Sequence, residues 1–228
     1  TASPVISDGV LYIGSHDGSL YALGAEDGAP MWRYPTDGRI EAGAALAGTS
    51  VFFGSSDNHI YALDAASGGL QWRHRTEGDI VSTPAIDKDT LYVGSVDRKL
   101  YALDAATGQA RWVFEADHAI ESSPAVADGV VYFGANDGRL YALRTSDGRP
   151  VWQHQAGDLV RSSPAVWEEL VFVGSDDGYI YGLDRETGTP VWSYRTGGAV
   201  AAGPVVGDGQ LFVSSTDRRL HAFELDTE

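Results

Sequence analysis

The sequence predicts an all-β protein built from six copies of one forty-residue unit. The first observation is a recurring segment, LYIGSHDGSLYAL, which starts at Leu11 and returns in related form at Val51, Leu91, Val131, Val171 and Leu211. The second is that tryptophan keeps the same forty-residue spacing, at positions 32, 72, 112, 152 and 192. The third is that no segment shows the apolar spacing of an amphipathic helix. Such a period indicates a repeat architecture in which each unit buries its apolar surface against the next.

Each unit predicts four short strands, as the fourth unit illustrates. Residues 122–126, 130–134, 140–143 and 151–155 are apolar or β-branched stretches separated by turn-forming residues. The sequence 136–138, Asn-Asp-Gly, predicts a tight hairpin, because Asp-Gly suits the positive φ angles of such a turn. Four strands in about forty residues are typical of one blade of a β-propeller. We therefore predict four-stranded antiparallel blades that stack radially, with the fourth-strand tryptophan packed between neighbouring blades.

The number of units predicts a six-bladed β-propeller that occupies residues 1–228 as a single domain. The expected blades are about 1–40, 41–80, 81–120, 121–160, 161–200 and 201–228. First, second and third strands occur six times but fourth strands only five times, so we expect the last blade to lack its outer strand. We expect the ring to close at six blades. The alternative is a part of a larger, seven- or eight-bladed propeller.

Composition and charge exclude several classes of partner. The formal net charge is −16, and so acidic a surface repels nucleic acid and anionic lipid. No stretch approaches the roughly 18 apolar residues of a membrane-spanning helix, so we expect no membrane insertion. The chain has no cysteine, which removes disulfides and cysteine-based metal sites. We expect a monomeric domain that binds no metal.

The repeat resembles that of the pyrroloquinoline-quinone (PQQ) family. The resemblance is carried by DAATGQARW at residues 104–112 and by the pattern Gly-x-x-x-Trp, which recurs in five units and extends over essentially the whole chain. It implies a propeller, but the family includes quinoprotein dehydrogenases, a periplasmic lipoprotein scaffold that helps assemble outer-membrane proteins, and sensor domains of bacterial Ser/Thr kinases. The resemblance therefore leaves the function open, because one fold supports many functions.

The enzyme branch of that family fits this sequence poorly. Its members are longer, carry insertions that build the quinone and calcium site, and often have a vicinal cysteine pair, whereas here every unit has forty residues and cysteine is absent. No Gly-x-Ser-x-Gly motif, phosphate-binding loop or metal-type histidine spacing occurs either. We predict an extracytoplasmic, non-catalytic propeller without a cofactor that binds a protein or ligand, either as the sensor domain of a kinase-type receptor or as an assembly scaffold. The alternative is a PQQ-dependent dehydrogenase-type enzyme or a quinone-binding protein.

Positions that are constant between units are expected to be structural. An aspartate recurs at positions 17, 57, 97, 137, 177 and 217. An acidic ring that binds a cation is one explanation, but we favour turn chemistry, in which the carboxylate accepts hydrogen bonds from nearby backbone N–H groups. His74, His154 and His221 occupy positions where other units have Tyr or Phe, so we expect these histidines to be packing residues.

Positions that vary between units are free to carry function, and many fall in two sets of loops expected on one face. These are the loops between second and third strands and the loops between blades. The predicted binding face consists of Arg39, Glu41, His59, Asp79, Lys99, His118, Glu121, Arg139, Arg161, Tyr179 and Arg219. Because arginine forks hold carboxylates well, we expect a protein or a small anionic ligand there.

Trp167 is a second candidate contact, on the opposite face. It is the only tryptophan outside the regular spacing, at a turn position where the other units have small or polar residues. We expect it to be partly exposed and able to contact a partner. The alternative is that it folds back onto its own blade.

Overall fold

The computed structural model describes residues 2–225, and this part of the chain contains only strands, turns and loops. Its 23 strands form six antiparallel sheets, of which five have four strands and one has three. In every four-stranded sheet the strands pair in chain order, so each sheet is a meander. The predicted all-β architecture of six blades is therefore confirmed.

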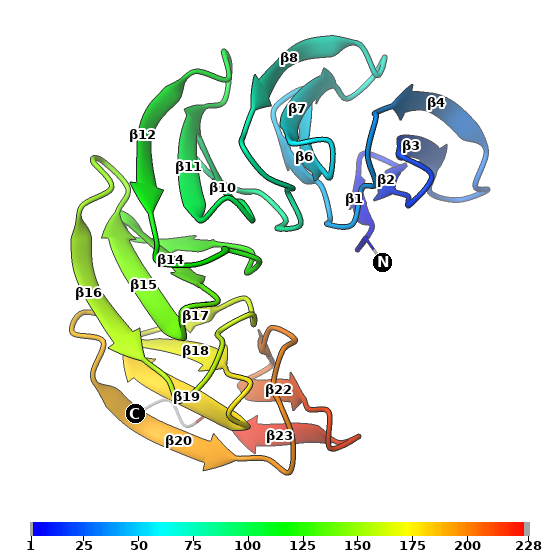
Figure 1. Cartoon of the computed structure of the whole chain (residues 1–228). Helices are drawn as coiled ribbons and strands as arrows, with labels where there is room; N and C mark the ends of the chain where they lie inside the picture. The colour runs from blue at the N-terminus through cyan, green and yellow to red at the C-terminus, as the bar shows by residue number, and fades with distance from the viewer. Residues whose placement is uncertain (1, 226–228) are drawn as a thin grey trace. The chain divides into compact units, whose positions relative to one another are not determined.

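The chain divides into two compact units, residues 1–115 and 116–228, with three sheets each. The N-terminal unit contains β1 (Val5–Ser7), β2 (Val10–Gly14), β3 (Ser19–Gly24), β4 (Pro30–Pro35), β5 (Ala45–Ala47), β6 (Ser50–Ser55), β7 (His59–Asp64), β8 (Leu70–Arg75), β9 (Ala85–Asp87), β10 (Thr90–Gly94), β11 (Lys99–Asp104) and β12 (Ala110–Glu115). The C-terminal unit contains β13 (Ala125–Ala127), β14 (Val130–Gly134), β15 (Arg139–Arg144), β16 (Pro150–Gln155), β17 (Ala165–Trp167), β18 (Leu170–Gly174), β19 (Tyr179–Asp184), β20 (Pro190–Arg195), β21 (Val205–Gly207), β22 (Gln210–Ser214) and β23 (Leu220–Glu224). Figure 1 shows the long fourth strands, such as β8 and β20, flanking the third strands.

The last sheet has three strands in the part of the chain that the structure describes, in the order β21-β22-β23. The expectation that the last blade lacks its outer strand is thus confirmed for residues up to 225. Closure of the ring at six blades stays a prediction.

The first strand of each blade is shorter than the sequence predicts. In the fourth unit we expect residues 122–126, but β13 begins at Ala125. The reason is that Ser122 is buried and its hydroxyl accepts a hydrogen bond from the backbone N–H of Gly134 at 3.1 Å, so this segment approaches the next strand through a side chain. The second strand, Val130–Gly134, has the predicted bounds.

Three fourth-strand tryptophans connect their blade to the next one within the same compact unit. The indole Nε1 of Trp32 donates to the carbonyl oxygen of Ala65 at 2.9 Å, and Trp72 and Trp152 make the same bond to the carbonyls of Ala105 and Arg185. The ring also lies beneath a glycine of the next blade's turn, at Gly68, Gly108 or Gly188, where φ is +70°. A Cβ atom at these glycines would come within 2.5–2.7 Å of the indole, so only glycine fits.

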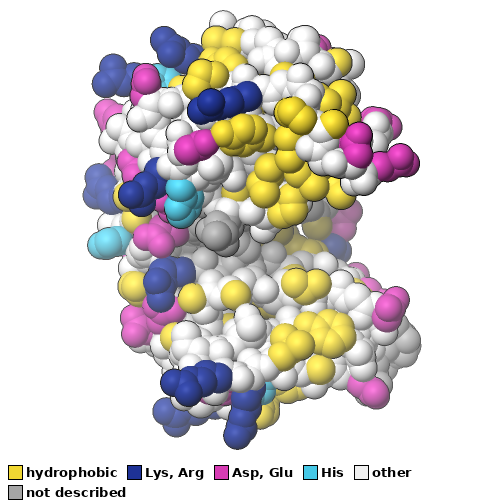
Figure 2. All heavy atoms as spheres, turned by 90° about the vertical axis from the view of Figure 1, so that its right-hand side faces the viewer, with side chains coloured by type: hydrophobic (Ala, Val, Ile, Leu, Met, Phe, Trp, Pro, Cys, Tyr) yellow, Lys and Arg dark blue, Asp and Glu magenta, His cyan; other side chains and the backbone are white. Residues whose placement is uncertain are grey.

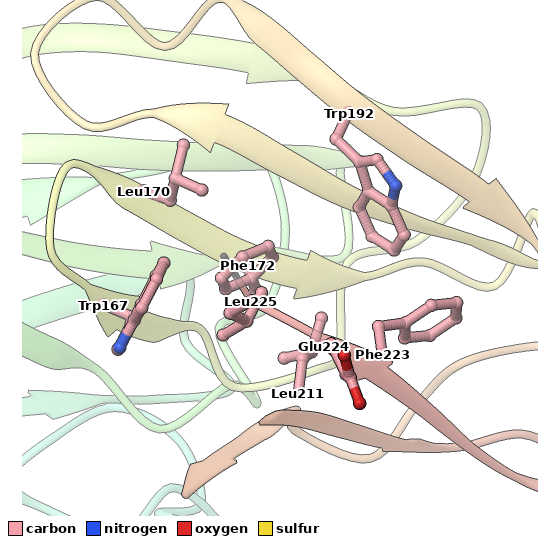
Figure 3. Close-up of a pocket in the computed structure, with 8 residues that line it drawn as sticks. All are labelled: Trp167, Leu170, Phe172, Trp192, Leu211, Phe223, Glu224 and Leu225. Atoms are coloured by element: carbon pink, nitrogen blue, oxygen red, sulfur yellow. The ribbon is translucent and has the colours of Figure 1, made fainter. Parts of the chain in front are cut away.

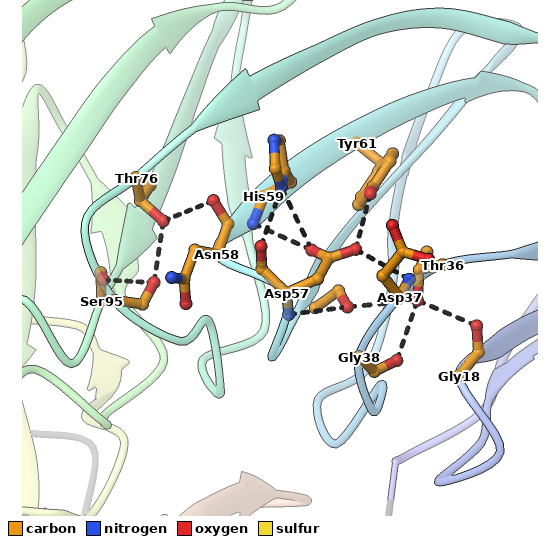
Figure 4. Close-up of polar contacts among 12 residues, drawn as sticks. Gly18, Thr36, Asp37, Gly38, Asp57, Asn58, His59, Tyr61, Thr76 and Ser95 are labelled. Carbon is orange, nitrogen blue, oxygen red and sulfur yellow. Dashed lines mark hydrogen bonds and ion pairs between the residues drawn. The ribbon is translucent and has the colours of Figure 1, made fainter.

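The recurring aspartate is a structural clamp, as Figure 4 shows for Asp57. Its Oδ1 accepts from the N–H of His59 at 3.1 Å, which closes the turn. Its Oδ2 accepts from the Tyr61 hydroxyl at 2.7 Å and from the N–H of Asp37, in the loop from the preceding blade, at 3.1 Å. The other five blades have the same turn-closing hydrogen bond at their own aspartates. Turn chemistry thus accounts for the constant aspartates.

Candidate functional site

In the second to sixth blades the two predicted sets of loops lie side by side. The loop between second and third strands donates a backbone N–H to the loop that enters its blade, from Ser56 to Arg39, from Val96 to Asp79, from Asn136 to Ala119, from Asp176 to Leu159 and from Thr216 to Ala199, at 2.8–3.0 Å. We call these two sets of loops the loop face. Its backbone is fixed by repeated hydrogen bonds, so its variable side chains project from a rigid base.

In the N-terminal unit the predicted residues lie on this loop face but form no single cluster. The His59 ring turns back so that Nδ1 lies 2.9 Å from the Asp57 carbonyl oxygen. Lys99 pairs with Glu77 at 2.5 Å. Arg39 is exposed and, among the described residues, has no ion pair. Glu41 and Asp79 are half-buried.

In the C-terminal unit four loop-face side chains form two parallel pairs. Asn136 donates from Nδ2 to Glu121 Oε1 at 2.7 Å, and Arg161 pairs with Asp176 at 2.6 Å. The other oxygens of these pairs, Asn136 Oδ1 and Asp176 Oδ1, are buried and have no hydrogen-bond partner. Two buried acceptors without donors leave hydrogen-bonding capacity at equivalent places in neighbouring blades.

Farther along the same loops the C-terminal unit places the remaining predicted residues. Arg139 contacts Asp117 and also donates from Nε to Gln155 at 3.0 Å. The Tyr179 ring lies under the guanidinium of Arg195, with 5.8 Å from Cζ to the ring centroid. His118 and Arg219 are exposed.

This pairing changes the predicted electrostatics of the loop face. From the sequence we expect arginines that hold a carboxylate of a protein or an anionic ligand, but Lys99, Arg139 and Arg161 each contact a carboxylate of their own compact unit. Figure 2 shows Lys and Arg side chains interspersed with Asp and Glu on the molecular surface. The face therefore carries charges of both signs. The acidic partners Asp117, Glu77 and Asp176 are the residues that sequence reasoning missed, because their pairing depends on loop geometry.

The tyrosines of the third strands that bond to the recurring aspartates have raised pKa values. Burial and the hydrogen bond to Asp137 raise the pKa of the Tyr141 hydroxyl to about 12, and burial also raises the pKa of Tyr61 and Tyr181. These tyrosines are thus neutral donors to the clamp aspartates. Burial lowers the pKa of His154, whose Nε2 has no hydrogen-bond partner and whose ring lies 5.2 Å from that of Tyr181. His154 is a packing residue, as predicted from its position.

Trp167 lies on β17 in the C-terminal unit and is half-buried. It lines an apolar cavity of about 330 Å3 together with Leu170, Phe172, Trp192, Leu211, Phe223, Glu224 and Leu225. Figure 3 shows Trp167 and Trp192 at opposite sides of this cavity, with Phe223 beside Trp192. The ring belongs to the contact between the last two blades, so a role in partner binding stays a prediction.

Within residues 2–225 there is no group of three or more His, Asp or Glu side chains placed to hold a metal ion. Nor do the described residues contain a helix long and apolar enough to cross a membrane.

The six meander sheets, their tryptophan contacts and the regular forty-residue register define a β-propeller of PQQ-type repeats. A profile of the family described as "Outer membrane protein assembly factor BamB" matches residues 1–84, 77–166 and 157–228, and the chain belongs to this family. No curated protein sequence matches the chain.

Solved structures confirm the fold. The computationally designed Ika8 protein superposes with a TM-score of 0.87 at 18% identity, over 99% of this chain and 70% of that one. BamB from Moraxella catarrhalis gives a TM-score of 0.66 at 22% identity, over 99% of this chain and 85% of its own. The quinohemoprotein alcohol dehydrogenase ADHIIG from Pseudomonas putida HK5 gives 0.74 at 18% identity, over 85% of this chain and 41% of that one. At these identities the likeness concerns the fold alone.

Proposed function

We propose that this chain is a non-catalytic scaffold for protein assembly outside the cytoplasm, and that its partner binds on the loop face. Membership of a family described as an outer membrane protein assembly factor supports a protein-binding role and an extracytoplasmic location. Charges of both signs on the loop face fit a polar protein surface. A sensor domain would use the same face, and the partner recovered there would distinguish the two roles.

The observation that carries this proposal is the contrast between backbone and side chains on the loop face. The hydrogen bonds that join the two loop sets recur from blade to blade, whereas the side chains that project from them differ, as Glu121 and Arg161 illustrate. A rigid frame with varied polar side chains lowers the entropic cost of binding and allows specificity.

The test is photo-crosslinking in an extract of the native host. A photoreactive residue at Tyr179 or His118 reports on the loop face, one at Glu186 reports on the turns of the opposite face, and one at Trp167 reports on the rival site. We expect adducts from the two loop-face positions. Adducts from Trp167 alone would show that the partner binds elsewhere.

A matched pair of variants sharpens the test. The double variant Arg139→Ser, Arg161→Ser removes two loop-face arginines, and the control Arg144→Ser, Arg149→Ser removes two from the opposite turns of the same unit. We expect recovery of the crosslinked partner to fall at least ten-fold in the first variant and to stay unchanged in the control. Stoichiometric uptake of PQQ with calcium, accompanied by dye reduction, would contradict a non-catalytic function.

A further inference from the structure

We infer that the outer edge of β8 is a docking site for an extended, acidic segment of another polypeptide, which adds a strand to the second blade. This edge is distinct from the loop face, and the inference does not depend on the function proposed for that face. In each four-stranded sheet the fourth strand has the third strand as its one partner among the described residues, so its outer N–H and C=O groups are open to a further strand. Figure 1 shows β8 on the outer side of its sheet, beyond β6 and β7.

Two arginines of β8 present their backbone groups to this edge. The N–H of Thr76, the residue after β8, donates to the carbonyl oxygen of Asn58 at 2.9 Å, so it points inward, to the hairpin that precedes β8. Because successive residues of a strand turn their N–H and C=O groups to opposite sides, those of Arg75 and Arg73 point outward, to the open edge. No other strand or loop among the described residues bonds to these groups.

The side chains of Arg73 and Arg75 give this edge a positive charge. They lie on one side of the strand, because residues two apart point the same way, and both are exposed. Neither has an ion pair among the described residues, whereas Glu77, the nearest acidic residue along the chain, pairs with Lys99 at 2.5 Å. The net charge of the chain is −16, so two arginines without an acidic partner are an exception in this protein. An acidic segment therefore complements the edge in charge.

The other fourth strands have features that protect an open edge. In β4, Pro35 takes the place of Arg75 and has no N–H to donate, and β16 and β20 begin with proline. In β12 the same place is taken by Glu115, whose charge repels an acidic segment. Among the five fourth strands, β8 therefore combines an edge without proline with two exposed arginines.

Two side chains fix β8 to the third blade. The indole Nε1 of Trp72 donates to the carbonyl oxygen of Ala105 at 2.9 Å. The ring Nδ1 of His74 lies 2.9 Å from the carbonyl oxygen of Gly108. These contacts come from the residues that alternate with the arginines, so they hold the strand without using its outer edge. A strand held in this way is preorganised, which lowers the entropic cost of adding a partner strand.

The edge also indicates the pattern of the segment that fits it. In an added strand the residues opposite Arg73 and Arg75 are two apart and lie on the same side, so acidic residues there place carboxylates beside both guanidinium groups. Next to Arg75 an open cavity of about 420 Å3, lined also by Asn58, Thr76 and Glu77, leaves room for such a side chain. The residue between the two acids faces the side of the sheet that packs on the third blade, so we expect it to be apolar. A second copy of β8 would place arginine opposite arginine, which disfavours a homodimer through this edge.

The probe is the synthetic peptide TEVEVT with blocked ends, added to the whole chain and followed by nuclear magnetic resonance. We expect saturable binding of one peptide per chain, which weakens as the salt concentration rises. The amides of Arg73 and Arg75 should exchange quickly in the free protein and become protected by the peptide. The amides of Trp72 and His74 point toward β7, so their exchange should stay unchanged.

A matched pair of variants tests the charge. The double variant Arg73→Gln, Arg75→Gln copies the residues at the equivalent positions of the fourth blade, so the blade accommodates it. It should weaken binding of the peptide by about ten-fold, because two cross-strand ion pairs are lost. The control Arg144→Gln, Arg149→Gln removes two arginines from the C-terminal unit and should leave binding unchanged. The reversal Arg73→Glu, Arg75→Glu should instead bind the peptide TKVKVT.

N-methylation of the peptide tests strand addition itself. Methylation of an amide that faces β8 should abolish saturable binding, whereas methylation of the next amide, which faces solvent, should leave it unchanged. Four results would overturn the inference: no saturable binding, equal binding by the Arg73→Gln, Arg75→Gln variant, equal effects of the two methylations, or a stable dimer of the chain with the amides of Arg73 and Arg75 protected. None of these results bears on the crosslinking test of the loop face.

Discussion

At the residue scale the fold depends on a few side chains that repeat the same contact from blade to blade. The clamp aspartate closes its own turn and holds the loop from the preceding blade. The fourth-strand tryptophan holds the following blade through a carbonyl oxygen. Where both contacts occur within one compact unit, neighbouring blades are therefore joined through one polar contact and one aromatic contact.

The two kinds of tryptophan should differ in their contribution to stability. Trp152 is 9% exposed and bonds to Arg185, so Trp152→Ala should lower the free energy of unfolding by about 3–5 kcal/mol. Trp167 is half-buried beside an existing cavity, and Trp167→Ala should cost less than half as much. Urea titrations of the two variants check this. Equal losses would show that Trp167 is as important to the core as the regular tryptophans.

His154 should make stability sensitive to mild acid. Its pKa is lowered by burial, so the unfolded chain binds a proton more readily than the folded one. The stability associated with the neutral ring is complete above the unfolded pKa of about 6.5 and is lost as the pH falls below it. His154→Phe, which copies the residue at position 114, should reduce the drop in urea midpoint between pH 7.5 and pH 5.5. A drop as large as in the wild type would assign the acid sensitivity to other groups.

At the scale of elements, the turns between third and fourth strands determine how closely blades pack. Gly188 lies over Trp152, whereas Gly28 adopts nearly the same φ, +68°, and a Cβ atom added there would meet nothing within 4 Å. A substitution at Gly28 therefore measures the cost of the positive φ alone, whereas one at Gly188 measures that cost together with a steric clash.

This pair predicts the outcome of two alanine substitutions. Gly28→Ala incurs only the backbone cost of a positive φ, about 1 kcal/mol. Gly188→Ala adds a clash at 2.5 Å with the Trp152 ring and should be destabilising by at least twice as much. Thermal melts of both variants measure the difference. Similar losses would mean that the indole moves aside without cost.

The strands were predictable from the sequence because six aligned copies of one repeat show which positions are apolar in every copy and which form turns. The forty-residue repeat predicted the position of the second strand, of the turn aspartates and of the tryptophans. It also predicted that no fourth strand occurs in the last blade of this sequence. The start of β13 was not predictable, since Ser122 binds Gly134 through its hydroxyl and not through strand pairing. The order of the strands predicted which residues lie on the loop face. It did not predict that Arg139 pairs with Asp117, because that contact depends on loop conformations that strand patterns do not determine.

At the scale of the whole molecule, the forty-residue register predicts that the sixth blade packs against the first. Cysteine is absent, so spin labels can be attached to pairs of introduced cysteines at equivalent exposed turns. Asp128→Cys with Glu168→Cys measures the spacing of adjacent blades within one unit. If the ring closes at six blades, Asp8→Cys with Asp208→Cys should give the same distance by double electron–electron resonance. A clearly longer distance would instead favour a part of a larger propeller.

The last sheet, which has three strands in the part of the chain that the structure describes, also affects how the chain loses its structure. In the described residues Trp192 makes no hydrogen bond to a carbonyl oxygen of the next blade. The angle between the ring planes of Trp192 and Phe172 is 83°, compared with 43° for Trp152 and Tyr132. Molecules made of stacked repeats lose order first where a repeat has the fewest neighbours. We therefore expect unravelling to start at β23 and proceed one blade at a time toward the interior of the C-terminal unit.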